Sequence, residues 1–170
     1  VYQMMLNAES FWPQLENKIK GTNDFVKQIN PELSQEQKIN TVYNYVRDNI
    51  DWDNWYSKSS ANGVNEAWQN KSGTSGDINL ILINLLRKAG VEAYPILVSQ
   101  RFHGKVDTAY PYIDQFNSVF AFVNINSKKY FLDATDKHTP VYITPSSILN
   151  TIGFKKKKKK AGLIFISNDS

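Results

Sequence analysis

A polar turn bracketed by glycines opens the most apolar helix that the sequence predicts, over residues 74–89. Thr74 stands before this helix and Asp77 follows three residues later, a pattern typical of an N-terminal cap that satisfies the first free backbone N–H groups. The side chain of Ser75 is then placed at the positive end of the helix dipole. Enzymes commonly put a cysteine thiolate in such a place, because the dipole and the nearby N–H groups lower its pKa. This chain puts a hydroxyl there.

A predicted hairpin places two further polar residues near one another. Two apolar strands flank a turn at Asn126 and Ser127, and pairing outward from that turn sets Ser118 opposite Thr135. Asp133 is then a diagonal neighbour of Ser118 on the same face of the sheet. A nucleophile at a helix start, a base at the start of one strand and an orienting carboxylate on the next strand form the layout of a catalytic triad. The sequence has this layout, but Ser118, which stands at the position of the base, is not a basic residue.

Three motifs together resemble those of the transglutaminase-like superfamily. They are Gly73-x-Ser75-x-Asp77, Phe116-Asn117-Ser118 and Phe131-Leu132-Asp133-Ala134-Thr135, with a long apolar helix ending in Leu86-Arg87-Lys88-Ala89-Gly90 after the first of them. The resemblance covers about residues 34–137. It implies a papain-like fold and the Cys–His–Asp triad of that family.

Carried over to this chain, the resemblance implies a degenerate triad. Ser75 stands at the cysteine position, Ser118 stands at the histidine position, and Asp133 matches the aspartate. A serine needs a base to become a nucleophile, so the resemblance implies a member that has lost catalysis. Each residue also has a plainer interpretation, since Ser75 can help to cap its helix and Asp133 can hold loop N–H groups. His103 and His138 fall in predicted loops, where solvent exposure is the expected state.

The resemblance also implies a binding cleft around these positions, with no metal site and no cofactor. The polar and aromatic side chains expected in the cleft are Trp68, Asp77, Asn79, Tyr110, Gln115, Asn117 and Asp136. A cluster of aromatic residues, Trp52, Trp55, Tyr56 and Trp68, falls in the segment 51–70, which is predicted to be irregular. Such a cluster either stacks on a sugar or a peptide or pins a long loop to the core, and the second role is favoured.

The composition excludes several classes of protein. The chain has 170 residues, is 41% hydrophobic and contains no cysteine, which predicts one folded domain without disulfides, a thiol nucleophile or cysteine-ligated zinc. Six of its 20 basic residues form the run Lys155 to Lys160, and the remaining 14 face 16 acidic residues. We therefore expect no nucleic-acid partner, and we interpret the run as a solvated loop between two terminal elements. No segment is long and apolar enough to span a membrane.

The order of the predicted elements indicates an α+β fold. A helical N-terminal part over residues 1–50, a core over 64–137 and an extension over 138–170 form a single domain, with the helices packed on an antiparallel sheet. Ser34 and Gln37 form a capping box at the start of one helix. Pro95 places the first strand of the sheet, over 91–98, at an edge or beside a bulge.

The function that these features favour is binding without catalysis. We expect a catalytically inactive transglutaminase-like domain that serves as a binding or scaffolding module, for a peptide or a glycan, within a larger exported bacterial protein of which this chain is a fragment. A periplasmic or extracellular location fits the absence of cysteine, although the chain starts with no signal peptide. One alternative is an active hydrolase or acyl transferase, with Ser75 as nucleophile and His103 as a substitute base. The other is a purely structural module that packs against neighbouring domains.

Overall fold

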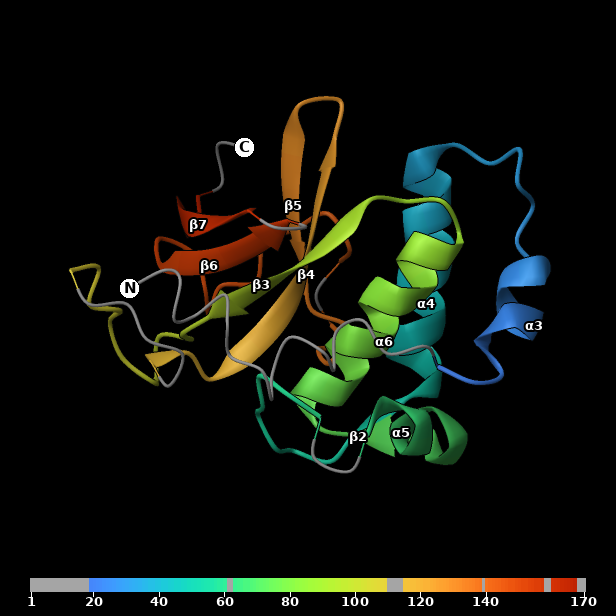
Figure 1. Cartoon of the computed structure of the whole chain (residues 1–170), viewed down its shortest axis with the longest axis horizontal. Coiled ribbons are helices and arrows are strands. Elements are labelled where there is room, and N and C mark those ends of the chain that lie inside the picture. The colour runs from blue at the N-terminus through green and yellow to red at the C-terminus, as the bar shows by residue number, and fades with distance from the viewer. Residues whose placement is uncertain (1–18, 61–62, 110–114, 139, 158–159, 168–170) are drawn as a thin grey trace.

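The helices of this protein gather on one side of a five-stranded antiparallel sheet in the computed structural model (Figure 1). The structure describes residues 19–60, 63–109, 115–138, 140–157 and 160–167. The first 18 residues of the predicted helical N-terminal part, which covers residues 1–50, therefore lie outside the described residues. The described elements are α3 (Thr22–Lys27), α4 (Gln35–Asn49), β1 (Asp51–Trp52), α5 (Val64–Asn70), β2 (Ser72–Gly73), α6 (Ser75–Lys88), β3 (Ala93–Val98), β4 (Ser118–Ile125), β5 (Lys128–Leu132), β6 (Ile152–Lys157) and β7 (Lys160–Phe165). This arrangement confirms the predicted α+β class.

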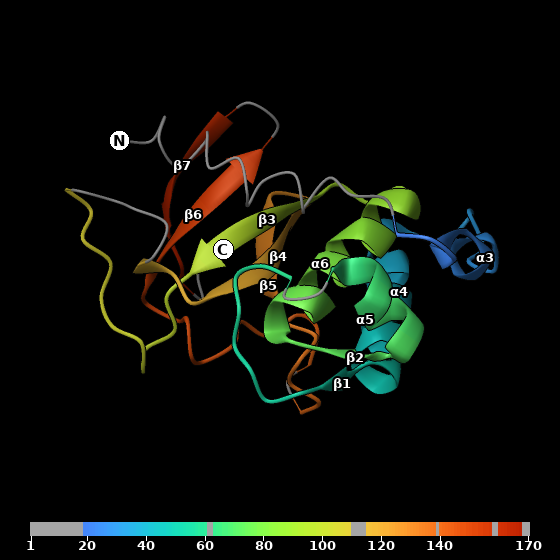
Figure 2. The same cartoon turned by 60° about the horizontal axis from the view of Figure 1, so that its bottom comes forward.

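Helix α6 lies between the other helices and the sheet, as two views show (Figures 1 and 2). It packs against α3, α4 and α5 on one side and against β3 and β4 on the other. Its apolar side chains are almost completely buried on every face, and they include Ile78, Ile81, Leu82, Ile83, Leu85 and Leu86. A helix whose apolar side chains are buried on nearly every face lies inside a protein, so α6 forms the centre of the core.

Both predicted capping boxes form. The Ser34 side chain accepts a hydrogen bond from the backbone N–H of Gln37, whose side chain accepts one from the N–H of Ser34. Thr74 and Asp77 make the same reciprocal pair at the start of α6. These bonds satisfy N–H groups that have no partner within the helix, and they fix where each helix begins.

The strand over 93–98 is not an edge strand, contrary to the expectation from Pro95. The sheet order is β5-β4-β3-β6-β7, so β3 is the middle strand. Proline is tolerated because β6 pairs with β3 only at Ile96–Val98, while Pro95 pairs with Ala121 of β4 on the other side. At Pro95 one side of the strand has no ladder for its missing N–H to interrupt.

The hairpin of β4 and β5 forms around the predicted turn, but it is shorter than expected. Ile125 pairs with Lys128, and Asn126 and Ser127 both have positive φ, as a two-residue hairpin turn requires. The ladder ends at Leu132, so Ser118 does not pair with Thr135. Ser118 pairs instead with Val98 of β3. The chain leaves the sheet before Asp133, so contacts outside the strand ladder position the Asp133 carboxylate.

Two segments predicted as irregular contain regular elements. Four of the six lysines of the run do not lie in a loop, because Lys155 to Lys157 belong to β6 and Lys160 begins β7. Lys155 pairs with Ile96 of β3 and with Gly162 of β7, and its ammonium lies 4.7 Å from the ring centre of Phe122. The segment 51–70 holds the short helix α5 and strand β1, which pairs in parallel with β2.

We expect glycine to be required at one position of the β6–β7 hairpin and dispensable at another. A Cβ at Gly153 would lie 2.7 Å from Cδ1 of the buried Ile96, whereas a Cβ at Gly162 would meet nothing within 4 Å. Gly153→Ala should lower the free energy of unfolding by about 1–3 kcal/mol through overpacking. Gly162→Ala, the matched control, should leave it unchanged or raise it slightly. Urea denaturation of the two variants measures the difference, and equal stabilities would contradict this packing.

Candidate functional site

The first turn of α6 holds Ser75 in a closed environment. The Ser75 backbone N–H donates to the carbonyl of Trp55 at 2.9 Å, and the residue is only 1% exposed. Its hydroxyl accepts a hydrogen bond from the N–H of Ser57 at 2.7 Å and lies 3.2 Å from the carbonyl oxygen of the same residue, to which it donates. The side chain at the predicted nucleophile position is therefore bound on two sides to the peptide groups of another segment.

That segment, residues 55–60, is here called the strap. It crosses the N-terminus of α6 and is fixed to Asp77 by a short hydrogen bond from the Ser60 hydroxyl. Gly76 allows the close approach, because a Cβ at this position would overlap the backbone carbonyl oxygens of Ser57 and Ser59. The strap thus covers the helix end where a nucleophile would otherwise be open to solvent.

The structure brings Ser118 to Ser75, as the predicted layout requires. Their hydroxyl oxygens are 3.3 Å apart, and Ser118 is completely buried. Ser118 is the first residue of β4, so it stands at the end of the sheet that faces the start of α6. A hydroxyl has no basic lone pair that could take a proton from Ser75 at neutral pH.

Asp133 is held by a buried network rather than by either serine. One oxygen, Oδ1, accepts hydrogen bonds from the amide of Asn79 at 2.9 Å and from the N–H and hydroxyl of Thr135 at 3.1 and 2.6 Å. Asn79 lies one turn after Ser75 on α6, and it also donates to the carbonyl of Val119 and accepts from the N–H of Ala134. The amide of Asn79 therefore joins the helix, strand β4 and the turn after β5.

Burial sets the protonation behaviour around this carboxylate. Removal from water raises the pKa of Asp133, and the hydrogen bonds from Thr135 and Asn79 offset part of that rise. The Tyr43 hydroxyl donates to the backbone carbonyl of Asp133 at 3.2 Å. Burial, followed by the charge of Asp133, raises the pKa of Tyr43 to about 12. Both groups are thus held toward their neutral forms.

A pocket of about 560 Å³ opens beside this network. Its lining residues are Asp51, Trp52, Tyr56, Gln100, Asp133, Thr135, Asp136, Lys137, His138, Pro145, Ser146 and Ser147. The Trp52 and Tyr56 rings have centres 4.9 Å apart, and Phe102 continues the row 5.0 Å further on. The lining therefore combines aromatic rings with carboxylate, amide, imidazole and hydroxyl groups, a composition suited to binding a polar organic molecule.

The cleft residues predicted from sequence take different places. Asp133 and Asp136 line the pocket. Behind it, Asp77 caps α6, Asn79 holds Asp133, and the Asn117 amide bonds the backbone and side chain of Gln100. Two others do not line the pocket: Trp68 is buried in α5, and Gln115 bonds Asp107 in the loop before β4. Tyr110 lies outside the described residues.

Several lining residues escaped sequence reasoning. The sequence places Trp52 and Tyr56 in an aromatic cluster and favours a role in pinning a loop to the core, whereas both residues line the pocket in the structure. His138 was expected to be exposed and is, yet it also lines the pocket. Gln100 and Ser147 carry no local signal, because they meet only through the fold, where the Gln100 amide donates to the Ser147 hydroxyl at 3.2 Å.

The two histidines make no hydrogen bond with Ser75 within the part of the chain that the structure describes. The backbone N–H of His138 donates to Asp136, and His103 is exposed in the loop after β3. In the same described part, no group of three or more His, Cys, Asp or Glu side chains is arranged to hold a metal ion. None of its helices has the length and apolar character needed to cross a bilayer.

Comparisons with known proteins agree with the fold and identify the family. A family model described as the transglutaminase-like superfamily matches residues 23–142. Among solved structures, a putative protease from Parabacteroides distasonis superposes with a TM-score of 0.62 and 14% sequence identity, over 91% of this chain. The match spans only 29% of that longer protein. A search of curated proteins gave no match.

The raised pKa of Asp133 predicts a pH-dependent stability. An acid with a higher pKa in the folded state binds its proton more tightly when folded. The contribution of Asp133 to the free energy of unfolding is therefore full below the pKa of the unfolded state, about 3.9. It is lost as pH rises through the pKa of the folded state. Asp133→Asn keeps an Oδ1 acceptor for Asn79 and Thr135 but cannot ionise.

Unfolding free energies of the wild type and Asp133→Asn, measured from pH 3 to pH 8, test this effect. The wild type should lose stability relative to the variant as pH rises above about 4. Because the other carboxylates are common to both proteins, their titration cancels in the difference. A difference that is flat with pH, or that changes in the wild type's favour, would contradict the assignment.

Proposed function

Because this chain belongs to the transglutaminase-like superfamily, we propose that it is a catalytically inactive member that binds a peptide or a glycan in the pocket beside Asp133. The observation that carries the proposal is the state of Ser75. Its hydroxyl is buried, it is bonded to the strap and to Ser118, and it has no base among its described partners. A nucleophile must reach its substrate and give up a proton, so a hydroxyl that is buried and bonded in this way supports the proposal.

The strap links the lost nucleophile to the pocket. Trp52 and Tyr56 stand just before and within the strap and form the aromatic wall, and the Trp52 indole N–H donates to the Trp55 carbonyl at 2.9 Å. Ser75 binds the same stretch through Trp55 and Ser57. In this proposal Ser75 has a structural role, because its hydrogen bonds hold the strap, and with it the aromatic wall of the pocket, in place.

The pocket chemistry favours a polar ligand with a flat apolar face. Aromatic rings stack on the C–H faces of sugars and on peptide side chains, and the surrounding amide and hydroxyl groups exchange hydrogen bonds with hydroxyls or peptide groups. Asp51 is paired with Lys137 at 3.1 Å, so its charge is locally balanced.

We further propose that the domain belongs to a larger exported bacterial protein, where such a module would hold a ligand for its neighbouring domains.

Covalent labelling tests the absence of catalysis. A broadly reactive fluorophosphonate should leave the intact mass of the wild type unchanged, because the Ser75 hydroxyl is covered and unactivated. A serine hydrolase labelled in parallel shows that the reagent is active, and Ser75→Ala serves as the site control. One adduct on the wild type that is lost in Ser75→Ala would instead identify a serine-nucleophile enzyme.

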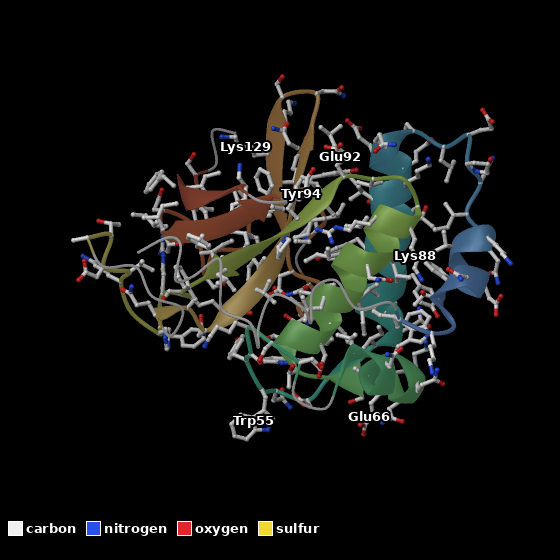
Figure 3. All side chains as sticks on the ribbon, viewed as in Figure 1. Trp55, Glu66, Lys88, Glu92, Tyr94 and Lys129 are labelled. Atoms are coloured by element: carbon white, nitrogen blue, oxygen red, sulfur yellow. The ribbon has the colours of Figure 1, made fainter. Side chains whose placement is uncertain are left out.

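Ligand screening tests the binding role. An oligosaccharide array and a peptide panel should yield a ligand whose affinity falls tenfold or more in Trp52→Ala, because the ring forms a pocket wall. Trp55→Ala is the matched control, since that ring is 72% exposed, points away from the body of the domain (Figure 3) and does not line the pocket. Equal losses in the two variants, or no ligand from either class, would favour a purely structural module.

A further inference from the structure

A second pocket, of about 410 Å³, lies between the loop that follows β3 and the outer strands of the sheet. Its lining residues are Ser99, Arg101, Gly104, Lys105, Val106, Asn150, Thr151, Ile152 and Phe165. None of these residues lines the pocket beside Asp133. Along the chain, Gln100 lines that first pocket while Ser99 and Arg101 on either side of it line the second. A short stretch of backbone thus separates two distinct sites.

Backbone hydrogen bonds hold the walls of the second pocket together. The N–H of Arg101 donates to the carbonyl of Ser147 at 2.8 Å, which ties the loop to the segment before β6. Asn150 and Thr151 exchange backbone bonds with Ile166 at 2.8 and 2.9 Å, which ties that segment to the end of β7. The pocket is therefore formed by the fold itself, as small-molecule sites usually are.

The polar lining of this pocket is cationic. Among the described residues that line it, two are cationic, Arg101 and Lys105, and none is acidic. Nε and Nη2 of Arg101 both donate to the carbonyl of Leu149, at 3.2 and 2.7 Å, which fixes the plane of the guanidinium. Within the described part of the chain, neither Nη1 of Arg101 nor the Lys105 ammonium has a hydrogen bond or ion pair with the protein. Two cationic hydrogen-bond donors at this pocket are therefore available to bind an anion.

The rest of the lining is apolar. Val106 and Ile152 are half-buried, and the Phe165 ring is 60% exposed at the end of the edge strand β7. An exposed aromatic ring beside a formed pocket gains from contact with an apolar group, because that contact removes both surfaces from water. The pocket therefore offers one charged end and one apolar end.

We propose that this pocket binds a small carboxylic acid with an apolar tail. The carboxylate would accept hydrogen bonds from Nη1 of Arg101 and from Lys105, and the tail would lie against Ile152 and Phe165. The fixed guanidinium favours a planar carboxylate, whose two oxygens match its N–H groups. This site is independent of the proposed function, since it uses neither Ser75 nor the residues around Asp133.

Titration with octanoate, followed by amide chemical shifts in NMR spectra, tests the proposal. Saturable shifts are expected at residues 99–106 and 151–152. Octan-1-ol, which has the same chain length without the charge, should bind roughly three- to tenfold more weakly, the range that an exposed ion pair supplies. Octylamine should bind more weakly still.

Three variants assign the two ends of the site. Lys105→Gln should weaken octanoate binding by roughly threefold or more, and it should leave octan-1-ol binding unchanged. Phe165→Ser should weaken both ligands. Lys129→Gln, at the far end of the β4–β5 hairpin (Figure 3), is the matched control and should change neither. Absence of saturable shifts, equal binding of octanoate and octan-1-ol, or shifts centred on the pocket beside Asp133 would each overturn the proposal.

Discussion

The amide of Asn79 is the interaction on which the site depends. Its Nδ2 donates to the carbonyl of Val119 and to Asp133, and its Oδ1 accepts from the N–H of Ala134. The side chain is completely buried, so each of these groups would carry a desolvation penalty without its partner. A network satisfied in this way specifies one arrangement of helix, strand and turn. The position of Asp133 follows from it, although β5 ends one residue earlier.

The strap binds the N-terminus of α6. The first turn of α6 presents free N–H groups, and the strap supplies the carbonyl of Trp55 to one of them. Gly76 gives the strap room, and Ser75 bonds the peptide group of Ser57. The Ser75 side chain therefore joins the start of α6 to the strap.

Features encoded locally could be predicted from the sequence, and features assembled over long distances could not. The capping boxes at Ser34 and Thr74 and the turn at Asn126 depend on residues within three or four positions, and all three were predicted. The motifs also predicted the closeness of Ser75 and Ser118. The pocket was missed as a set, because its lining comes from segments around Trp52, Asp133 and Ser147 that carry no common pattern.

The lysine run shows that backbone pairing with neighbouring strands can place a highly charged segment in a sheet. β7 is an edge strand, and Lys157 stands opposite Lys160 beside the turn of its hairpin. An edge strand offers a row of backbone N–H and C=O groups to which a strand of another chain can add. The hairpin of β6 and β7 moves this open edge away from β3, so the middle strand of the sheet is paired on both of its sides.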